Sequence, residues 1–172
     1  MLTVKKTRLP LEIIEILIIV FALSWFMKTY LIQFASVGDN TMLPTLSQNN
    51  VVMVDKYFNV KLNTLERGDI VAYLSPKEER LVIKRVIGIP GDTVEIRNGY
   101  TYINGQPLYE PYAQIPVSYV FEPIVVSDNE LFVLNDNRTE IDDSRSDGNV
   151  SLDRLEGKAL LCVWPLSKIN SL

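Results

Sequence analysis

The chain begins with a long apolar stretch, and this stretch divides it into two unlike parts. Residues 11–33 are almost all apolar, and Glu12, Glu15 and Lys28 are the charges within them. A helix needs roughly 20 mostly apolar residues to cross the hydrocarbon layer of a bilayer, so the stretch is just long enough. The sequence therefore predicts a transmembrane anchor over residues 11–33, preceded by a tail over 1–10 and followed by a separate domain over 36–172.

Basic residues on one side of the stretch predict its orientation. Lys5, Lys6 and Arg8 precede it, and an excess of Lys and Arg marks the cytoplasmic side of a membrane span. We therefore expect a single-pass protein of the plasma membrane, with a cytoplasmic tail, an extracytoplasmic main domain and the lipid bilayer as a partner. The alternative is a cleaved secretory signal, but no Ala-x-Ala-like cleavage site precedes Val37.

The domain after the stretch is predicted to be mainly β, with antiparallel sheets. β-Branched runs bounded by turn residues are typical of strands, and such runs stand at 51–54, 69–74, 81–87 and 130–134. The pairs Asn98-Gly99 and Asn104-Gly105 predict two consecutive hairpin turns, because Asn-Gly suits the positive φ angles of a type I′ turn. The Pro-richer residues from about 98 to 130 predict a small inserted subdomain.

Composition excludes several kinds of site. The 172 residues carry a net charge of −4 and include no His, which argues against nucleic-acid binding, Ser-His-Asp catalysis and most zinc sites. Cys162 lies in an apolar run and is read as core packing. The segment 143–148 resembles a calcium loop, but Arg145 and Arg154 fall at ligand positions. No cofactor and no metal are therefore expected.

Lys84 is a charged residue in an apolar strand. Strand alternation places it on one face with Val82 and Val86, and Arg85 on the other face. Burial disfavours the ammonium form, and the neutral amine is the form that can act as a general base. An isolated lysine in a strand is more often a solvated edge charge, so the assignment depends on the segments around it.

Four segments, in order, resemble the motifs of the type I signal peptidases. They are Gly38-Asp39-Asn40-Thr41-Met42-Leu43-Pro44-Thr45-Leu46, Arg67-Gly68-Asp69, the run 82–92, and Asn135-Asp136-Asn137-Arg138 with Asp143-Ser144-Arg145. The family counterparts are Ser-x-Ser-Met-x-Pro-Thr-Leu, Arg-Gly-Asp, a Lys-Arg strand that ends in Gly-x-Pro-Gly-Asp, and Gly-Asp-Asn-Arg followed by Asp-Ser-Arg. The chain is identified as a member of this family on these segments.

The resemblance implies a β-rich fold and a Ser/Lys dyad that cleaves signal peptides after a small residue. Thr41 takes the nucleophile position and Lys84 the position of the general base. Met42 and Pro44 shape the loop that presents the nucleophile. A charged support under the site is implied for Asp136, Arg138, Asp143 and Arg145. The implied partner is a signal peptide or an exported precursor.

Three departures from the family pattern coincide with the chemistry. Thr41 replaces the nucleophilic Ser, and its extra methyl group restricts χ1. Asp39 stands where the family often has a Ser that donates to the developing oxyanion, and an ionised carboxylate cannot donate. Ile141 stands where a Ser usually orients the lysine, which an alkyl side chain cannot do.

These departures predict a protein that engages signal peptides or exported precursors at the outer face of the membrane, with cleavage impaired or lost. In this it resembles a subgroup with altered dyads that is linked to pilus assembly in Gram-positive bacteria, where the precursor is a pilin. The alternative is an active signal peptidase that uses a Thr41/Lys84 dyad, with Asn40 as a substitute oxyanion donor.

Overall fold

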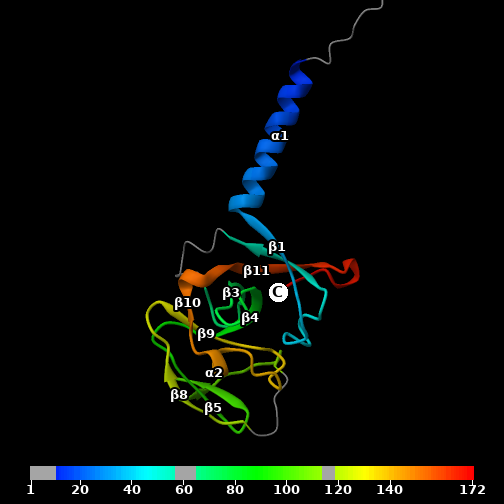
Figure 1. The fold of residues 1–172 in the computed structure, drawn as a ribbon. Coiled ribbons are helices and arrows are strands. Elements are labelled where there is room, and N and C mark those ends of the chain that lie inside the picture. Colours follow the sequence, from blue (N-terminus) through cyan, green and yellow to red (C-terminus); the bar gives the residue numbers. More distant parts are fainter. Residues whose placement is uncertain (1–10, 57–64, 114–118) are drawn as a thin grey trace, which may run out of the picture.

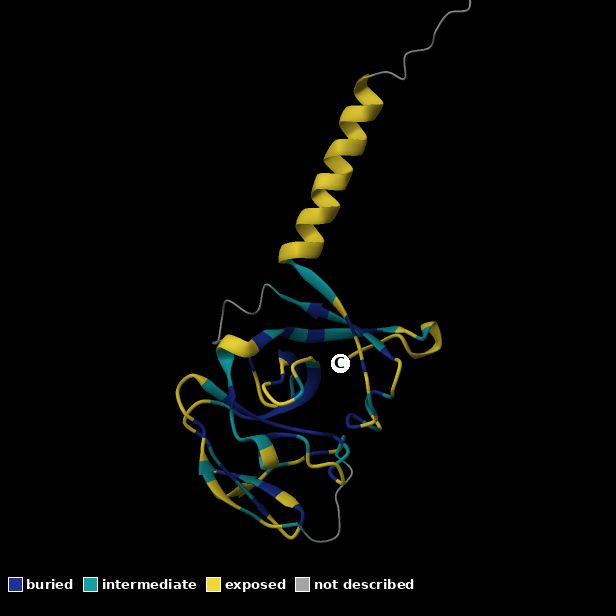
Figure 2. Cartoon of the chain, in the orientation of Figure 1, coloured by how far each residue is buried: buried dark blue, intermediate teal, exposed yellow. Residues whose placement is uncertain are grey.

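The N-terminal helix stands apart from the rest of the chain. The structure is a computed structural model that describes residues 11–56, 65–113 and 119–172, so the predicted tail 1–10 lies outside the described residues. Helix α1 (Leu11–Tyr30) buries none of its side chains and projects away from the β sheets (Figures 1 and 2). It ends before the predicted anchor does, because Ile32 and Gln33 already belong to strand β1 (Ile32–Ser36).

The hydropathy of this helix bears on the predicted anchor. Three charged side chains, those of Glu12, Glu15 and Lys28, fall within its 20 residues. Within the part of the chain that the structure describes, no helix is both long and apolar enough to cross a membrane. The predicted single-pass anchor is therefore not confirmed.

The larger sheet carries most of the predicted strands. Its order is β1-β2-β11-β3-β4-β9-β10, with β12 also paired to β11. The bounds are β2 Val51–Asp55, β3 Ile70–Leu74, β4 Leu81–Gly88, β9 Glu130–Leu134, β10 Val150–Ser151, β11 Leu155–Trp164 and β12 Asn170–Ser171. Short helices lie at α2 Ser144–Asp147, η3 Leu152–Arg154 and η4 Leu166–Lys168. Neighbouring strands of this sheet pair antiparallel among the described residues, so the mainly β, antiparallel fold is confirmed.

A smaller sheet holds the two predicted hairpin turns. Its order is β7-β6-β5-β8, and its strands are β5 Thr93–Arg97, β6 Tyr100–Ile103, β7 Gln106–Pro107 and β8 Phe121–Val125. The first turn has φ angles of 52° at Asn98 and 82° at Gly99, and the second has 53° at Asn104 and 77° at Gly105. Positive φ at both central residues is what a type I′ turn requires, so both hairpin predictions are confirmed.

One stretch of β4 has a neighbouring strand on one side only. Strand β3 pairs with β4 from Leu81 to Arg85. Strand β9 pairs with β4 from Arg85 onwards, at Arg85, Val86 and Gly88. Among the described residues, the other edge of 81–84 therefore has no strand partner. Lys84 ends this open stretch.

Candidate active site

The loop that carries Thr41 is fixed by its neighbours at both ends. It connects β1 to β2, and the side chain of Met42 is fully buried in a core cluster with Val37 and Leu46. The N–H of Leu46 donates to the carbonyl of Met42 at 2.8 Å. Pro44 is exposed, and the Leu43–Pro44 peptide bond is cis. The Thr41 carbonyl accepts from the N–H of Asn137 at 2.8 Å, which joins this loop to the late one.

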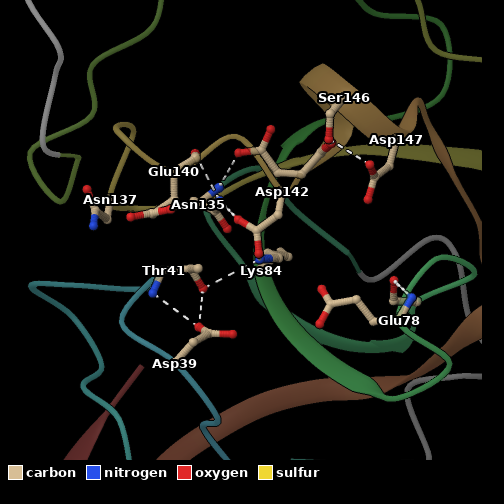
Figure 3. A network of polar contacts seen from close by, with 12 residues as sticks. Asp39, Thr41, Glu78, Lys84, Asn135, Asn137, Glu140, Asp142, Ser146 and Asp147 are labelled. Atoms are coloured by element: carbon tan, nitrogen blue, oxygen red, sulfur yellow. Dashed lines mark hydrogen bonds and ion pairs between the residues drawn. The ribbon is translucent and has the colours of Figure 1, made fainter.

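Lys84 reaches this loop from β4. Its side chain lies in the interior, with the residue only 1% exposed, and its Nζ lies 3.4 Å from Thr41 Oγ1 (Figure 3). The predicted burial of Lys84 is confirmed. The structure therefore brings together the two side chains predicted as nucleophile and base, which are 43 positions apart in the chain.

Asp39 lies closer to the Thr41 hydroxyl than Lys84 does. The hydroxyl donates to Asp39 Oδ1 at 2.6 Å, and the Thr41 N–H donates to the same oxygen at 3.1 Å. Arg80 donates to Asp39 Oδ2 at 3.1 Å. Burial raises the pKa of the Asp39 carboxyl, but the hydrogen bonds from Thr41 and Arg80 and the charge of Lys84 outweigh burial and hold it below its usual value.

This contact engages two groups that a serine-type peptidase uses in its reaction. The nucleophile's proton must pass to a base, and here the carboxylate holds it instead of Lys84. The backbone N–H of the nucleophile commonly donates to the oxyanion, and here it is already donated to Asp39. A negative charge at this point also opposes a developing oxyanion.

Ile141 is exposed, and a different residue of the late loop contacts Lys84. Ile141 is 54% exposed. The oxygen beside Lys84 belongs to Asp142, whose Oδ2 lies 3.4 Å from Nζ (Figure 3). Asp142 Oδ1 in turn accepts from the side-chain amide of Asn135 at 2.8 Å. Lys84 thus has a charged neighbour where the family pattern places a hydroxyl.

Buried ion pairs lie beneath the site. Arg85 donates through Nε and Nη2 to the two oxygens of Asp136, at 2.7 and 2.6 Å, and Asp136 is fully buried. The Thr45 hydroxyl donates to Asp136 Oδ2 at 2.5 Å. A bidentate guanidinium–carboxylate pair has a fixed geometry. It therefore anchors the Thr41 loop to β4 and to the end of β9.

The late loop is held in the same way. Asp143 accepts from Arg145 Nε at 2.8 Å and from the Asn135 N–H at 3.0 Å. Arg138 donates to the Asn135 carbonyl at 2.6 Å and pairs with the buried carboxylate of Glu110. The predicted support residues Asp136, Arg138, Asp143 and Arg145 thus form two linked groups under and beside the site. The carboxylate of Asp143, weighed as a calcium ligand, is occupied by these donors.

A small cavity lies beside Asp39, at the start of the Thr41 loop. Residues 36–39 form one wall and 80–83 the other, around a cavity of about 10 Å³, the size of one water molecule. Arg80 lies across it, within 3.1 Å of Asp39 and in contact with Glu78. Nearby, burial first, and then the charges of Asp147, Asp143, Glu78 and Asp142, raise the pKa of Tyr73 in β3.

Sequence reasoning missed four residues of this arrangement. Asn135 had a signal, because it replaces the first Gly of the family's Gly-Asp-Asn-Arg motif. Asp142 had a weaker signal, since it directly follows the departure at Ile141. Arg85 stands in the Lys-Arg pair of its motif but was given no role. Arg80 lies in a turn outside the motifs, and no sequence signal distinguishes it.

Comparison with known proteins finds relatives that cover most of this chain. Residues 10–164 match the family described as signal peptidase, peptidase S26. Signal peptidase I of Leptolyngbya laminosa is 35% identical over 153 residues, which cover 84% of this chain and 75% of that protein. Signal peptidase I T of Bacillus subtilis is 30% identical over 177 residues, covering 96% and 91% of the two chains. The crystal structure of a signal peptidase I from Enterococcus faecalis is 34% identical, covers 57% of this chain and 98% of its own, and superposes with a TM-score of 0.49.

The family match covers the Thr41 loop, the Lys84 strand and the late loop in one continuous alignment. The alignments with these two relatives cover most of this chain and most of each relative. The chain therefore belongs to the signal peptidase family, peptidase S26.

Proposed function

We propose that this protein engages the signal peptides of exported precursors at the outer face of the membrane and that its cleavage of them is impaired or lost. It would then act as an assembly factor for secreted or pilus proteins, with a pilin among its precursors. The observation that carries the proposal is the position of the Thr41 hydroxyl, 2.6 Å from Asp39 Oδ1 and 3.4 Å from Lys84 Nζ.

The open edge of β4 supports binding without cleavage. An extended peptide can add to a strand edge through backbone hydrogen bonds, a mode that does not depend on a nucleophile. Residues 81–84 of β4 offer such an edge among the described strands, and residues 36–39 lie near it around the small cavity. A bound segment would lie beside Thr41 and Lys84.

A cleavage assay on a peptide that spans the junction of a signal peptide and its mature protein tests this proposal. We expect the native chain to bind the peptide with little or no cleavage. The double variant Asp39→Ser with Thr41→Ser should gain activity, and so should the triple variant that adds Ile141→Ser. One hydrogen-bond donor to the oxyanion is typically worth a factor of about 10² to 10³ in rate, and Ser at position 39 can supply such a donor. The measurements are kcat/KM by mass spectrometry and peptide affinity by fluorescence anisotropy.

The controls separate binding from chemistry. Lys84→Ala should abolish any activity gained by the repaired variants while leaving peptide affinity in place. A native chain that cleaves as fast as the repaired variants would sink the proposal. A pilin-derived peptide run beside a secreted-protein peptide tests the narrower pilus role, which requires preferential binding of the pilin peptide.

One observation favours a second candidate, an active signal peptidase. Lys84 Nζ and Thr41 Oγ1 remain 3.4 Å apart in the interior, so a small rotation of the Thr41 side chain would place its hydroxyl against the amine. In that case Thr41→Ala and Lys84→Ala would each abolish cleavage by the native chain.

We also propose that helix α1 (Leu11–Tyr30) attaches the protein to the plasma membrane by a single pass, with the tail 1–10 cytoplasmic and the domain 36–172 extracytoplasmic. The support is the exposed apolar surface of α1, together with the basic residues before it. Alkaline carbonate extraction should leave the full chain in the membrane pellet. Protease added to intact protoplasts should digest the domain, and a protected domain would contradict the topology.

A further inference from the structure

The amino group of Lys84 has a fixed carboxylate beside it. Asp142 Oδ2 lies 3.4 Å from Nζ, and the Asp142 side chain is 34% exposed while that of Lys84 is 2% exposed. An ion pair with one buried and one half-exposed partner is screened less than a surface pair. Lys84 therefore has a directional partner other than Thr41.

Asn135 fixes the orientation of that carboxylate. Its Nδ2 donates to Asp142 Oδ1 at 2.8 Å and to the Glu140 carbonyl at 3.1 Å. The Asn135 residue is fully buried, and its N–H is held by Asp143. One Asp142 oxygen, Oδ1, therefore accepts from Asn135, and the other, Oδ2, faces Lys84 (Figure 3).

The charge of this partner decides what it does to the lysine. To take the proton of a hydroxyl nucleophile, Nζ must carry a free lone pair directed at that hydroxyl. Here Nζ donates a hydrogen bond to Asp142 Oδ2, at 3.4 Å, so this carboxylate competes with the Thr41 hydroxyl for the direction of the amino group. A neutral hydroxyl, which the family pattern places at Ile141, can orient the amine without favouring its charged form.

We propose that Asn135 and Asp142 form a positioning pair that holds Lys84 as an ion-paired donor and keeps it from accepting the proton of residue 41. This inference deepens the proposed function and rests on it: Asp39 holds the hydroxyl, and the Asn135–Asp142 pair holds the base. Each of the two proton-transfer partners thus has its own carboxylate.

The first test measures the chemistry of the amine itself, without a signal peptide. Reductive methylation at fixed pH, followed by peptide mass spectrometry, gives the rate at Lys84 relative to Lys77. We expect about a tenfold rise in this ratio for Asp142→Asn, since a hydrogen bond to a charged group accounts for a factor of that order. Asn135→Gly, which restores the family residue, should raise it in the same direction. Asp147→Asn is the control, because Asp147 pairs with Lys77 at 3.2 Å and has no contact with Lys84 among those described here. Since this variant alters the surroundings of Lys77, its methylation rate at Lys84 is compared with the rate at Lys158 instead.

The second test uses the repaired chain. In the background of Asp39→Ser and Thr41→Ser, adding Asp142→Asn should raise kcat by about tenfold with little change in KM. Adding Asp147→Asn should change neither. Thermal unfolding of each variant establishes that it is folded.

The outcomes distinguish this inference from the proposed function. An unchanged methylation ratio in Asp142→Asn, or a repaired chain that slows when Asp142 is changed, would overturn the positioning pair while precursor binding stands. Signal-peptide cleavage by the native chain would overturn the proposed function, and the methylation ratio would still decide the state of Lys84.

Discussion

Asp39 accepts hydrogen bonds from two groups of Thr41, the hydroxyl and the backbone N–H, and only the structure shows this, because it depends on the rotamer of Asp39. The sequence predicts that a carboxylate at this position cannot donate to an oxyanion. The structure adds that the same oxygen accepts both the hydroxyl and the N–H of Thr41. A motif states which residue stands two positions before the nucleophile, but the direction of its side chain depends on Arg80, 41 positions away.

Asp92 gives a prediction at the same scale. Burial raises its pKa, but hydrogen bonds from Arg67, the Ile89 N–H and Asn104 prevail and hold the pKa below its usual value of 3.8. A carboxyl whose pKa is lower in the folded state adds stability above its unfolded pKa, and that stability is lost as the pH falls through the folded value. The free energy of unfolding should therefore drop below about pH 4, and less so in Asp92→Asn.

Urea unfolding between pH 3 and pH 7 measures this effect. The exposed Asp128→Asn serves as the control for the loss of one negative charge. A pH dependence of the same size in Asp92→Asn and in the native chain would show that the hydrogen bonds to Asp92 do not carry the effect.

At the scale of elements, local pattern predicts where the strands lie, but it does not give their order in the sheet. The runs at 51–54, 81–87 and 130–134 agree with β2, β4 and β9 to within one residue, because β-branched alternation and turn residues are local signals. Strands of two residues, such as β7 and β10, are too short to show alternation. The apolar Ile32 suits a helix end and a strand start equally, so the predicted anchor extends too far.

The open edge of β4 could not be predicted from its own residues. It exists because β9 pairs with β4 from Arg85 onwards, which places the late loop beside Lys84. Pairing between strands about 50 residues apart in the chain is a property of the whole sheet. The family motifs located the residues of the site, but the small cavity between 36–39 and 80–83 appears only in the folded chain.

At the scale of the whole molecule, one buried ion pair joins the region of the smaller sheet to the site. Glu110 follows β7, and its carboxylate pairs with Arg138 of the late loop, with both side chains 3% exposed. Arg138 also donates to the Thr101 hydroxyl of β6 at 3.1 Å. The late loop is therefore braced by the smaller sheet as well as by β9.

Removing one partner of this pair should destabilise the fold. Glu110→Gln leaves a buried guanidinium without its counter-charge, which typically costs about 3 kcal/mol. Lys77→Gln breaks an exposed pair with Asp147 and should cost less than about 1 kcal/mol. Guanidinium chloride unfolding at pH 7 compares the two. Equal losses would mean that the Glu110–Arg138 pair is not a brace.

The bidentate pair of Arg85 and Asp136 has a consequence for how such a protein can change over time. The side chains that hold the Thr41 loop in place are different from those that would react, since Asp136 is fully buried and touches neither the Thr41 hydroxyl nor Lys84 Nζ in any described hydrogen bond. Mutations at positions 39, 41, 141 and 142 can therefore change the groups around the reaction centre and leave this pair in place. A protein of this kind could in this way lose the peptidase reaction and keep the loop positions on which peptide binding depends.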